Sequence, residues 1–361
     1  MRRSVFILSS LLVVLSCSKE DRRAVDKAME FSVNIPEVAV TKAEVTESGL
    51  TGGTDKVYVY GMMSDGASSK PVFESPGVAG LYYDNTAKIW NPKQGNDVVK
   101  WEDDENNNYY YRFYGYAYSS NARVGTDLII ANDIYGRQFT VTQPETASWT
   151  APDAAGAASD ESGTIDYLLS YLVSIPPSAN YPLVPLHFEH AMSKVEVDVR
   201  LAQAMIDKVQ DIRVSISGIK RGATMLCLQP KQDGEEGTNT WHVTFTENLS
   251  TASYTVESVN ITELNKSGNE NGIAPDMSFI AIPVMNEEMD GYTLTLTYYI
   301  ESQPQPYVYS FDLKKFTPDG WVNGHKVRYV LTIDNSIHLT GKIVDFEDVD
   351  YIEAVVMPGT N

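Results

Sequence analysis

The chain is poor in cysteine, histidine and basic residues. Its 361 residues include two cysteines and five histidines, and 48 acidic residues outnumber 28 basic ones, which gives a formal charge of -20. Two thiols cannot form a disulfide framework, and the acidic excess argues against a nucleic-acid partner, because phosphate binding needs clustered lysine and arginine. The hydrophobic fraction of 43% is that of a folded protein, and the length suits about two domains.

Local catalytic signatures are missing as well. The sequence has no G-x-S-x-G nucleophile elbow, no G-x-x-x-x-G-K-[ST] phosphate loop, no H-E-x-x-H and no C-x-x-C. The acidic run from Glu102 to Glu105 lacks the spacing and the central glycine of an EF-hand, and it is predicted to be a solvated hairpin loop. We therefore expect a protein that is not an enzyme and that uses no cofactor or metal.

One long apolar run stands at the N-terminus, in MRRSVFILSSLLVVLSC. Arg2 and Arg3 precede the stretch from Val5 to Leu15, which is too short to span a bilayer comfortably and is typical of an export signal. The ending VLSC resembles a bacterial lipobox, which predicts a lipoprotein signal peptide over residues 1–16 and lipidation of Cys17. The alternative is an ordinary secretory signal that happens to contain a cysteine.

Residues 17–28 are predicted to be a tether. Their beginning, SKED after Cys17, is similar to the short acidic export signal of surface lipoproteins in Bacteroidetes, and a plain solvated tether is the alternative. The pattern predicts an outer membrane lipoprotein that is exposed at the cell surface. Cys227 is then the one cysteine left beyond the anchor, and its apolar setting, TMLCLQ, predicts a buried and unreactive thiol.

Alternation of apolar and polar residues with a period of two dominates the rest of the chain. TLTLTYYI places Leu294, Leu296 and Tyr298 on one face, and KVRYVLTID follows the same pattern. YYYRFYGYAYSS, from Tyr109 to Ser120, is apolar on both faces, so it is predicted to lie in the middle of a packed sheet. Many short strands between Gly, Pro, Asn and Asp turns predict an all-β fold made of sandwiches.

Helical signals are weak. DYLLSYLVSI (166–175) and RLAQAMIDKVQ (200–210) could each form a short helix, but neither has a clear cap. The segment IPPSANYP, which ends just before a new strand, is the predicted domain boundary. It divides the chain into domains over residues 29–182 and 183–361.

Two histidines lie three residues apart in LHFEHAMSKVEVDVR, from Leu186 to Arg200. In a helix they would share one face, as a metal site or an acid-base pair needs. The apolar residues, however, fall on even positions up to Phe188 and on odd positions from Val195, which predicts a strand, an interruption and a second strand. Residues three apart in a strand point to opposite faces, so His190 is predicted to be a hydrogen-bonded core residue at a bend rather than a metal ligand.

The longer segment VPLHFEHAMSKVEVDVR resembles the signature segment of the fimbrillin proteins of Bacteroidetes, the FimA/Mfa-like, type V pilin superfamily. Other segments follow in the family's order: MEFSVNI with its sequel TKA, YYYRFYGYAYSS, DYLLSY and GWVNGHKVRYVLTIDNSI. The chain departs from the pattern at Lys42, Val330 and Phe346, where the family more often has arginine, a second aromatic residue and tryptophan. The resemblance implies structural roles for the signature residues Phe188, His190, Trp321, Gly324 and Tyr329.

The resemblance implies two transthyretin-like β-sandwich domains in tandem and a non-catalytic role as a fimbrial subunit or a fimbria-associated adhesin. In type V pili a lipidated precursor reaches the outer membrane, and a trypsin-like protease removes the N-terminal segment with its first strand. A strand from another subunit then fills the groove, because removal of an edge strand leaves backbone groups that a donated strand can satisfy. The expected partners are other pilin subunits, the outer membrane through the lipid anchor, and a host protein or glycan.

The removable strand is predicted in MEFSVNI, where Met29, Phe31, Val33 and Ile35 share one face. Lys42, in the loop that follows, is the candidate maturation cleavage point, and the alternative is a lysine that is merely solvated.

The candidate donor strand is the C-terminal segment DVDYIEAVVMPGTN, with Val349, Tyr351 and Val355 among its apolar residues. An ordinary edge strand or tail is the alternative.

A surface lipoprotein that binds glycans for a polysaccharide uptake system is the second hypothesis. Exposed aromatic side chains gathered on one face would mark it. The candidates are Trp90, Trp101, Trp149, Trp241 and Trp321, of which Trp321 is expected to be structural. An enzyme is the third hypothesis, and it would need carboxylates or histidines clustered in one cleft.

Overall fold

The computed structural model describes residues 27–35, 47–53, 55–74, 77–94, 97–102, 109–119, 128–132, 137–150, 160–161, 164–170, 172–176, 182–227, 241–245, 252–256, 277–334 and 337–345. Strands make up most of them, and α1 (Glu47–Gly52) is the one α-helix within these ranges. The 3-10 helices there are η1 (Gln203–Met205), η2 (Asn286–Glu288) and η3 (Leu313–Lys315). The predicted all-β class is confirmed.

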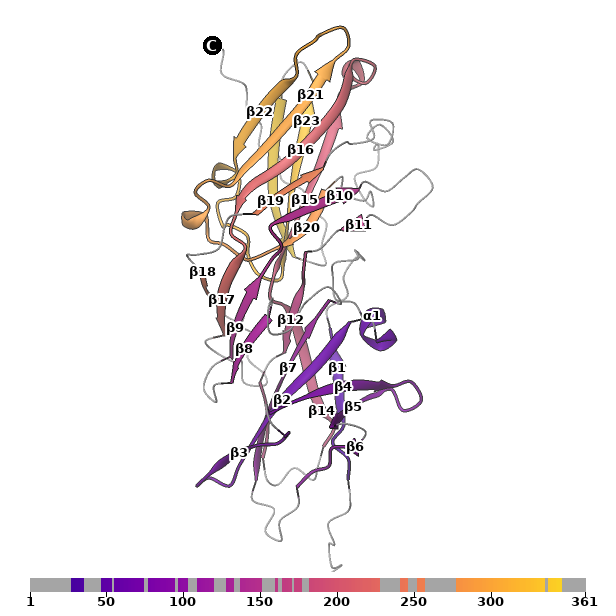
Figure 1. Ribbon diagram of the computed structural model, residues 1–361, viewed down its shortest axis with the longest axis vertical. Helices are drawn as coiled ribbons and strands as arrows, with labels where there is room; N and C mark the ends of the chain where they lie inside the picture. The colour runs from indigo at the N-terminus through magenta and orange to yellow at the C-terminus, as the bar shows by residue number, and fades with distance from the viewer. Residues whose placement is uncertain are drawn as a thin grey trace, which may run out of the picture.

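The lower half of the molecule is a closed sheet (Figure 1). Its hydrogen-bonded order is β7-β12-β14-β1-β5-β4-β2, and β2 pairs again with β7, so seven strands form a barrel. These strands are β1 (Phe31–Asn34), β2 (Lys56–Ser64), β4 (Val78–Asp84), β5 (Ile89–Gln94), β7 (Tyr110–Tyr118), β12 (Tyr167–Ser170) and β14 (Val184–His190). Three short strands attach to this barrel: β3 (Ser69–Pro71), β6 (Asp97–Val98) and β13 (Val173–Ile175).

The transthyretin-like β-sandwich expected for this half is not confirmed, because the sheet closes into a barrel. It is small enough for side chains to fill its interior, and Phe31, Phe113 and Leu186 are fully buried there. Glycines allow its walls to approach: a Cβ atom built on Gly115 would lie 2.5 Å from Cζ of Phe188. The predicted central strand is confirmed, because β7 has hydrogen-bonded neighbours on both sides.

The upper half is a sandwich of two sheets (Figure 1). One has the order β11-β10-β19-β16-β21-β22 and the other β20-β15-β23-β24, in which β15 and β23 are parallel. The first sheet consists of β10 (Thr146–Thr150), β11 (Asp160–Glu161), β16 (Val209–Ile219), β19 (Ala252–Val256), β21 (Thr293–Ile300) and β22 (Tyr307–Asp312). The second consists of β15 (Ser193–Leu201), β20 (Met277–Ala281), β23 (His325–Ile333) and β24 (Ile337–Asp345).

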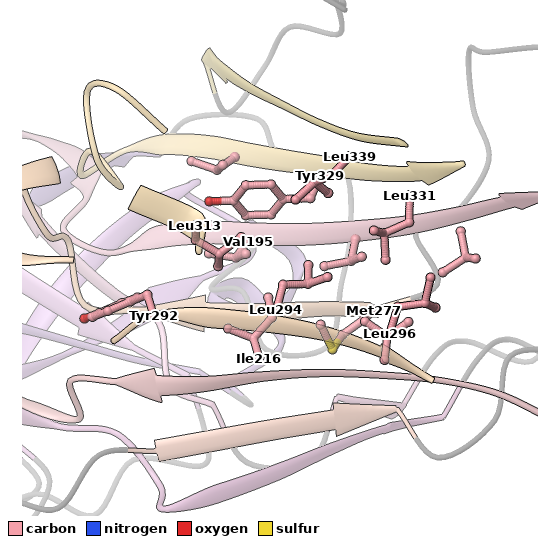
Figure 2. Close-up of a cluster of buried hydrophobic side chains, with 14 of the residues drawn as sticks. Val195, Ile216, Met277, Tyr292, Leu294, Leu296, Leu313, Tyr329, Leu331 and Leu339 are labelled. Atoms are coloured by element: carbon pink, nitrogen blue, oxygen red, sulfur yellow. The ribbon is translucent and has the colours of Figure 1, made fainter. Parts of the chain in front are cut away.

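The sandwich core follows from the alternation in the sequence. Inward residues of the two sheets meet between them, as Figure 2 shows for Leu294 and Leu296 from β21 and Leu331 from β23. All three are fully buried. The predicted strands around residues 292–300 and 327–333 are therefore confirmed, including the faces that they bury.

A third sheet, with the order β18-β17-β9-β8, lies between the barrel and the sandwich (Figure 1). Its strands are β8 (Leu128–Asn132), β9 (Arg137–Thr142), β17 (Gly222–Cys227) and β18 (Trp241–Phe245). The outer face of β7 packs in one cluster with β9 and β17 through Tyr116, Val141 and Ala223. We refer to this cluster as the joint.

The sheets do not follow the sequence at the predicted boundary. Strand β14, which begins after residue 182, is hydrogen-bonded within the barrel, and the chain enters the sandwich at β15. Strands β8, β9 and β10 precede residue 182, yet β9 pairs with β17 and β10 pairs with β19. Strands β8, β9 and β10 therefore belong to sheets that later residues complete.

The two segments considered as short helices are mainly strands. Residues 166–175 contain β12 and β13, which pair with β7, and residues 200–210 contain the end of β15, η1 and the start of β16. Short isolated helices are marginal in water, and several apolar residues of these segments are buried against neighbouring strands instead. Leu168 and Val209 are examples.

Replacement of Gly115 by alanine tests how closely the barrel walls approach. The added methyl group would overlap the ring of buried Phe188, so we expect Gly115→Ala to lower the free energy of unfolding by roughly 1–3 kcal/mol, as overpacking does. Urea denaturation measures the change. Gly80→Ala is the matched control, because its Cβ would meet its nearest neighbour at 3.6 Å, and it should change stability by no more than about 1 kcal/mol.

Candidate functional site

Strand β1 is one of the strands that form the wall of the barrel. It runs parallel to β14, with Phe31 opposite Val184 and Asn34 opposite His187, and it pairs with β5 on its other side. We expected an edge strand, but closure of the sheet gives β1 a neighbour on each side. Its removal would therefore open a slot between β14 and β5 and convert the barrel into an open sheet.

The two sides of β1 are held unequally. Four registered residue pairs join β1 to β14, whereas a single pair, Phe31 with Trp90, joins it to β5. Beyond β1, the amide of Met29 donates to the carbonyl oxygen of Val99 at 2.9 Å, and the amide of Trp101 donates to that of Lys27 at 3.1 Å. The backbone contacts of β1 with β5 are thus few, and β14 is its main partner.

Apolar side chains also anchor β1 and the residues beside it. Met29 and Phe31 are 0% exposed, whereas Val33 and Ile35 are partly buried at the edge of the same core. The ring of Phe31 meets the ring of Phe113 edge-on, with centroids 5.3 Å apart. Burial of a side chain of this size contributes about 1.5–3 kcal/mol, so a replacement strand must carry a comparable residue at that position.

The other residues predicted to act in assembly lie outside the described residues. These are Cys17, Lys42, Val349, Tyr351 and Val355. The described chain ends at Asp345, the last residue of β24. Their roles stay predictions.

The two histidines of the signature segment point in different directions. His187 is exposed on β14, whereas His190 is 2% exposed at the end of that strand. Nδ1 of His190 lies 2.8 Å from Oδ2 of buried Asp166, which precedes β12. The predicted hydrogen-bonded core histidine is confirmed, and so are the strand, interruption and strand around residues 191–192.

Trp321 and Tyr329 form a second buried polar group. Nε1 of Trp321 donates to the hydroxyl oxygen of Tyr329 at 2.9 Å, and the hydroxyl groups of Tyr329 and Thr317 are 2.6 Å apart. Burial raises the pKa of Tyr329 to about 12, because a charged phenolate is costly away from water. The expected structural role of Trp321 agrees with its exposure of 1%.

Gly324 brings the two signature segments together. It has a φ angle of +67°, which favours glycine, and its amide donates to the carbonyl oxygen of Met192 at 2.9 Å. Nearby, Oγ of Ser193 donates to the carbonyl oxygen of Val322 at 2.7 Å. Residues more than a hundred positions apart thus meet at the start of β15, where the chain passes from the barrel into the sandwich.

The side chains that contact these signature residues were not predicted from the sequence. No role was predicted for Asp166 or Thr317. Asp166 lies 24 positions from His190, and Thr317 lies outside the strands. The one available signal was that Asp166 begins DYLLSY, a segment of the family pattern.

Features of other functional classes are sparse in the described part of the chain. It holds no group of three or more His, Cys, Asp or Glu side chains arranged for a metal ion. No helix within it is long and apolar enough to cross a membrane. Of the five tryptophans, Trp90, Trp101 and Trp321 are buried, and the side chains of Trp149 and Trp241 lie outside the described residues.

Replacement of each histidine by glutamine separates their roles. His190→Gln should lower the free energy of unfolding by about 1–3 kcal/mol, because it disturbs a buried hydrogen bond to a carboxylate. The exposed neighbour serves as the control: His187→Gln should stay within about 0.5 kcal/mol of the wild type. Urea denaturation of both variants decides, and equal effects would contradict this assignment of roles.

The chain is similar to a known protein family and to several solved structures. A family model described as fimbrillin-like matches residues 41–346, whereas no curated protein matches the sequence. Similar solved structures include proposed cell adhesion proteins from Bacteroides uniformis (16% identity, TM-score 0.45, covering 88% of this chain and 99% of that one) and Bacteroides ovatus (12%, 0.48, 90% and 99%). Another is the fimbrial anchor protein Mfa2 from Porphyromonas gingivalis (12%, 0.28, 88% and 98%). Because the family model spans most of the sequence, this chain belongs to the fimbrillin-like family.

Proposed function

We propose that the protein is a subunit of a cell-surface fimbria, or an adhesin associated with one, and that it joins other subunits by strand exchange. A protease removes the segment that contains β1, and a strand from another subunit enters the slot between β14 and β5. The role is structural and adhesive rather than catalytic. Membership of the fimbrillin-like family supports the class of protein, and the position of β1 supports the mode of assembly.

The main support for strand exchange is that β1 has four registered pairs with β14 but one with β5. The segment that contains β1 buries Met29 and Phe31 completely, yet a single registered pair joins β1 to β5. A slot left by β1 would expose a buried apolar surface and the backbone groups of β14, both of which are costly to leave in water or without partners. An incoming strand with apolar residues at alternate positions satisfies both requirements.

The geometry of β14 limits how the donated strand can bind. The amide of Val184 donates to the carbonyl oxygen of Glu30 at 2.9 Å, so a replacement strand must supply a carbonyl group at that position. The main apolar site of the slot is the position of Phe31, against the ring of Phe113. The C-terminal segment with Val349, Tyr351 and Val355 is the proposed donor, since Tyr351 could place an aromatic ring there.

Anchoring is proposed through Cys17. Lipidation of this residue would hold the precursor in the outer membrane with the folded part exposed at the cell surface. The alternative of a glycan-binding protein for polysaccharide uptake receives no support from the described tryptophans, since Trp90, Trp101 and Trp321 are all buried.

Limited digestion with trypsin tests strand exchange. Cleavage after Lys42 should detach the segment that contains β1, and the cleaved protein should then form oligomers that size-exclusion chromatography and N-terminal sequencing detect. Lys42→Gln should block both events, whereas Arg23→Gln, upstream of the strand, should block neither. A shortened chain that ends at Asp345 should be cleaved but stay monomeric if the C-terminal segment is the donor.

Two results would count against this mechanism. If wild-type protein cleaved after Lys42 stays monomeric at high concentration, strand exchange is wrong. If the chain that ends at Asp345 assembles as well as the full chain, a segment other than the C-terminus donates the strand.

Replacement of Cys17 tests the anchor. Cys17→Ser should abolish incorporation of labelled palmitate during expression in a bacterial host that processes lipoproteins, and it should move the protein from the membrane fraction to the soluble fraction. Cys227→Ser is the control and should keep both properties. Palmitate labelling that persists in Cys17→Ser would refute lipidation at this residue.

A further inference from the structure

The outer face of the second sandwich sheet carries charged side chains that are largely buried. Val195, Val197 and Tyr329 face the sandwich core, so the residues that alternate with them on β15 and β23 point to the opposite side of the sheet. Six of those residues are charged: Lys194, Glu196, Asp198, Arg200, Lys326 and Arg328. We call these six residues the charged face.

Ion pairs connect the two strands of the charged face. Nζ of Lys194 lies 3.3 Å from Oε1 of Glu196, and Nζ of Lys326 lies 3.8 Å from Oε2 of the same carboxylate. Arg328 donates from Nε and Nη2 to Oδ2 of Asp198, at 2.8 and 2.6 Å. With four cations and two carboxylates, the face is a basic surface on a chain whose formal charge is -20.

These charges are shielded from water within a single chain. Lys194 is 2% exposed, Glu196 4% and Asp198 7%. Burial raises the pKa of Asp198, although the neighbouring Arg328 acts in the opposite direction. A sheet face that is turned away from the core is normally solvated, so another part of the same chain is expected to lie over this one. Because buried cations are costly unless carboxylates accompany them, that part is expected to be acidic.

The joint covers one end of the charged face. Ile280 lies beside Lys194 in the register of β20 with β15, and it belongs to the joint. Asp198 stands four residues farther along β15, about 13 Å away, and it interacts there with Arg328 and Arg200. The cover must therefore extend along the strands beyond Lys194.

The acidic segment that follows β24 has the charge that such a cover needs. Within seven residues it holds four carboxylates, those of Glu347, Asp348, Asp350 and Glu353. No lysine or arginine occurs between residues 346 and 361. The segment can therefore supply negative charge without bringing further cations to the face.

Position and length also suit this segment. Val344 pairs with Lys326, so Glu347 comes three residues, or about 10 Å of chain, after the point where β24 passes the charged face. Extended chain from Glu347 to Glu353 spans about 20 Å, and the strand from Lys194 to Arg200 has the same length. The segment can thus reach both ends of the face.

We propose that residues 347–353 lie across the charged face of their own subunit and pair their carboxylates with its lysines and arginines. A second copy of the chain fits less well, because the face is already shielded within one chain. The inference goes beyond the proposed fimbrial role and concerns the chain before assembly. If the C-terminal segment also donates a strand, it must first leave this face.

Cross-linking with a carbodiimide tests the proposal, because this reagent joins an ammonium group directly to a carboxylate that it contacts. On the intact exported chain, Lys194 or Lys326 should couple to a carboxylate of residues 347–353. Mass spectrometry of mixed isotope-labelled and unlabelled chains should show that the link forms within one molecule. Coupling of these lysines to Glu196 is the internal control. The proposal is overturned if they couple to Glu196 but not to residues 347–353, or if the links form between molecules.

Acetylation of lysines, read by mass spectrometry, gives a second test that does not depend on cross-linking. A variant with Glu347→Gln, Asp348→Asn, Asp350→Asn and Glu353→Gln should raise the labelling of Lys326 about threefold or more, because the cover loses its ion pairs. The matched control removes four charges before β20, with Glu257→Gln, Glu263→Gln, Glu270→Gln and Asp276→Asn, and it should leave the labelling unchanged. Thermal denaturation should show that both variants are folded. Unchanged labelling in the first variant, or an equal rise in the control, would refute the proposal.

Discussion

Strand β7 buries side chains on both of its faces, and both the barrel and the joint depend on this. Phe113 and Ala117 fill the barrel, whereas Tyr114, Tyr116 and Tyr118 face the strands between barrel and sandwich. Each face is matched by different partners, β14 and β1 on the inside and β9 and β17 on the outside. A polar substitution on either face would leave an apolar surface without its complement, so β7 has little freedom to vary.

The closed barrel changes what strand exchange requires. An edge strand can leave while the rest of its sheet keeps its hydrogen bonds, but departure of β1 removes one partner from β14 and one from β5. The barrel then becomes an open sheet, which can persist because its other strands, including β2 and β7, are joined by long antiparallel pairings. The energetic demand on a donor is therefore local, and it centres on the position that Phe31 occupies against Phe113.

Much of the fold could be predicted from period-two patterns, whereas its closure and connectivity could not. The alternation in residues 292–300 and 327–333 identified both strands and their buried faces, and the change of parity after Phe188 located the break before β15. Which strands pair with each other could not be predicted, because the buried face of a strand has the same sequence pattern in a sandwich and in a barrel. Asp166 escaped notice as the partner of His190 for the same reason: nothing local marks a contact that the tertiary fold creates.

Strands from early and late parts of the sequence pair with each other, and this pairing has a consequence for folding. Strand β10 pairs with β19, whose residues Ser253 to Val256 follow it by more than a hundred positions. Folding slows as contacts become more distant in sequence, since chain entropy is lost before those contacts form. Strands β8 and β9 can pair with each other early, but the edges that β17 and β19 cover stay open until those later strands have been synthesised, and open strand edges favour aggregation.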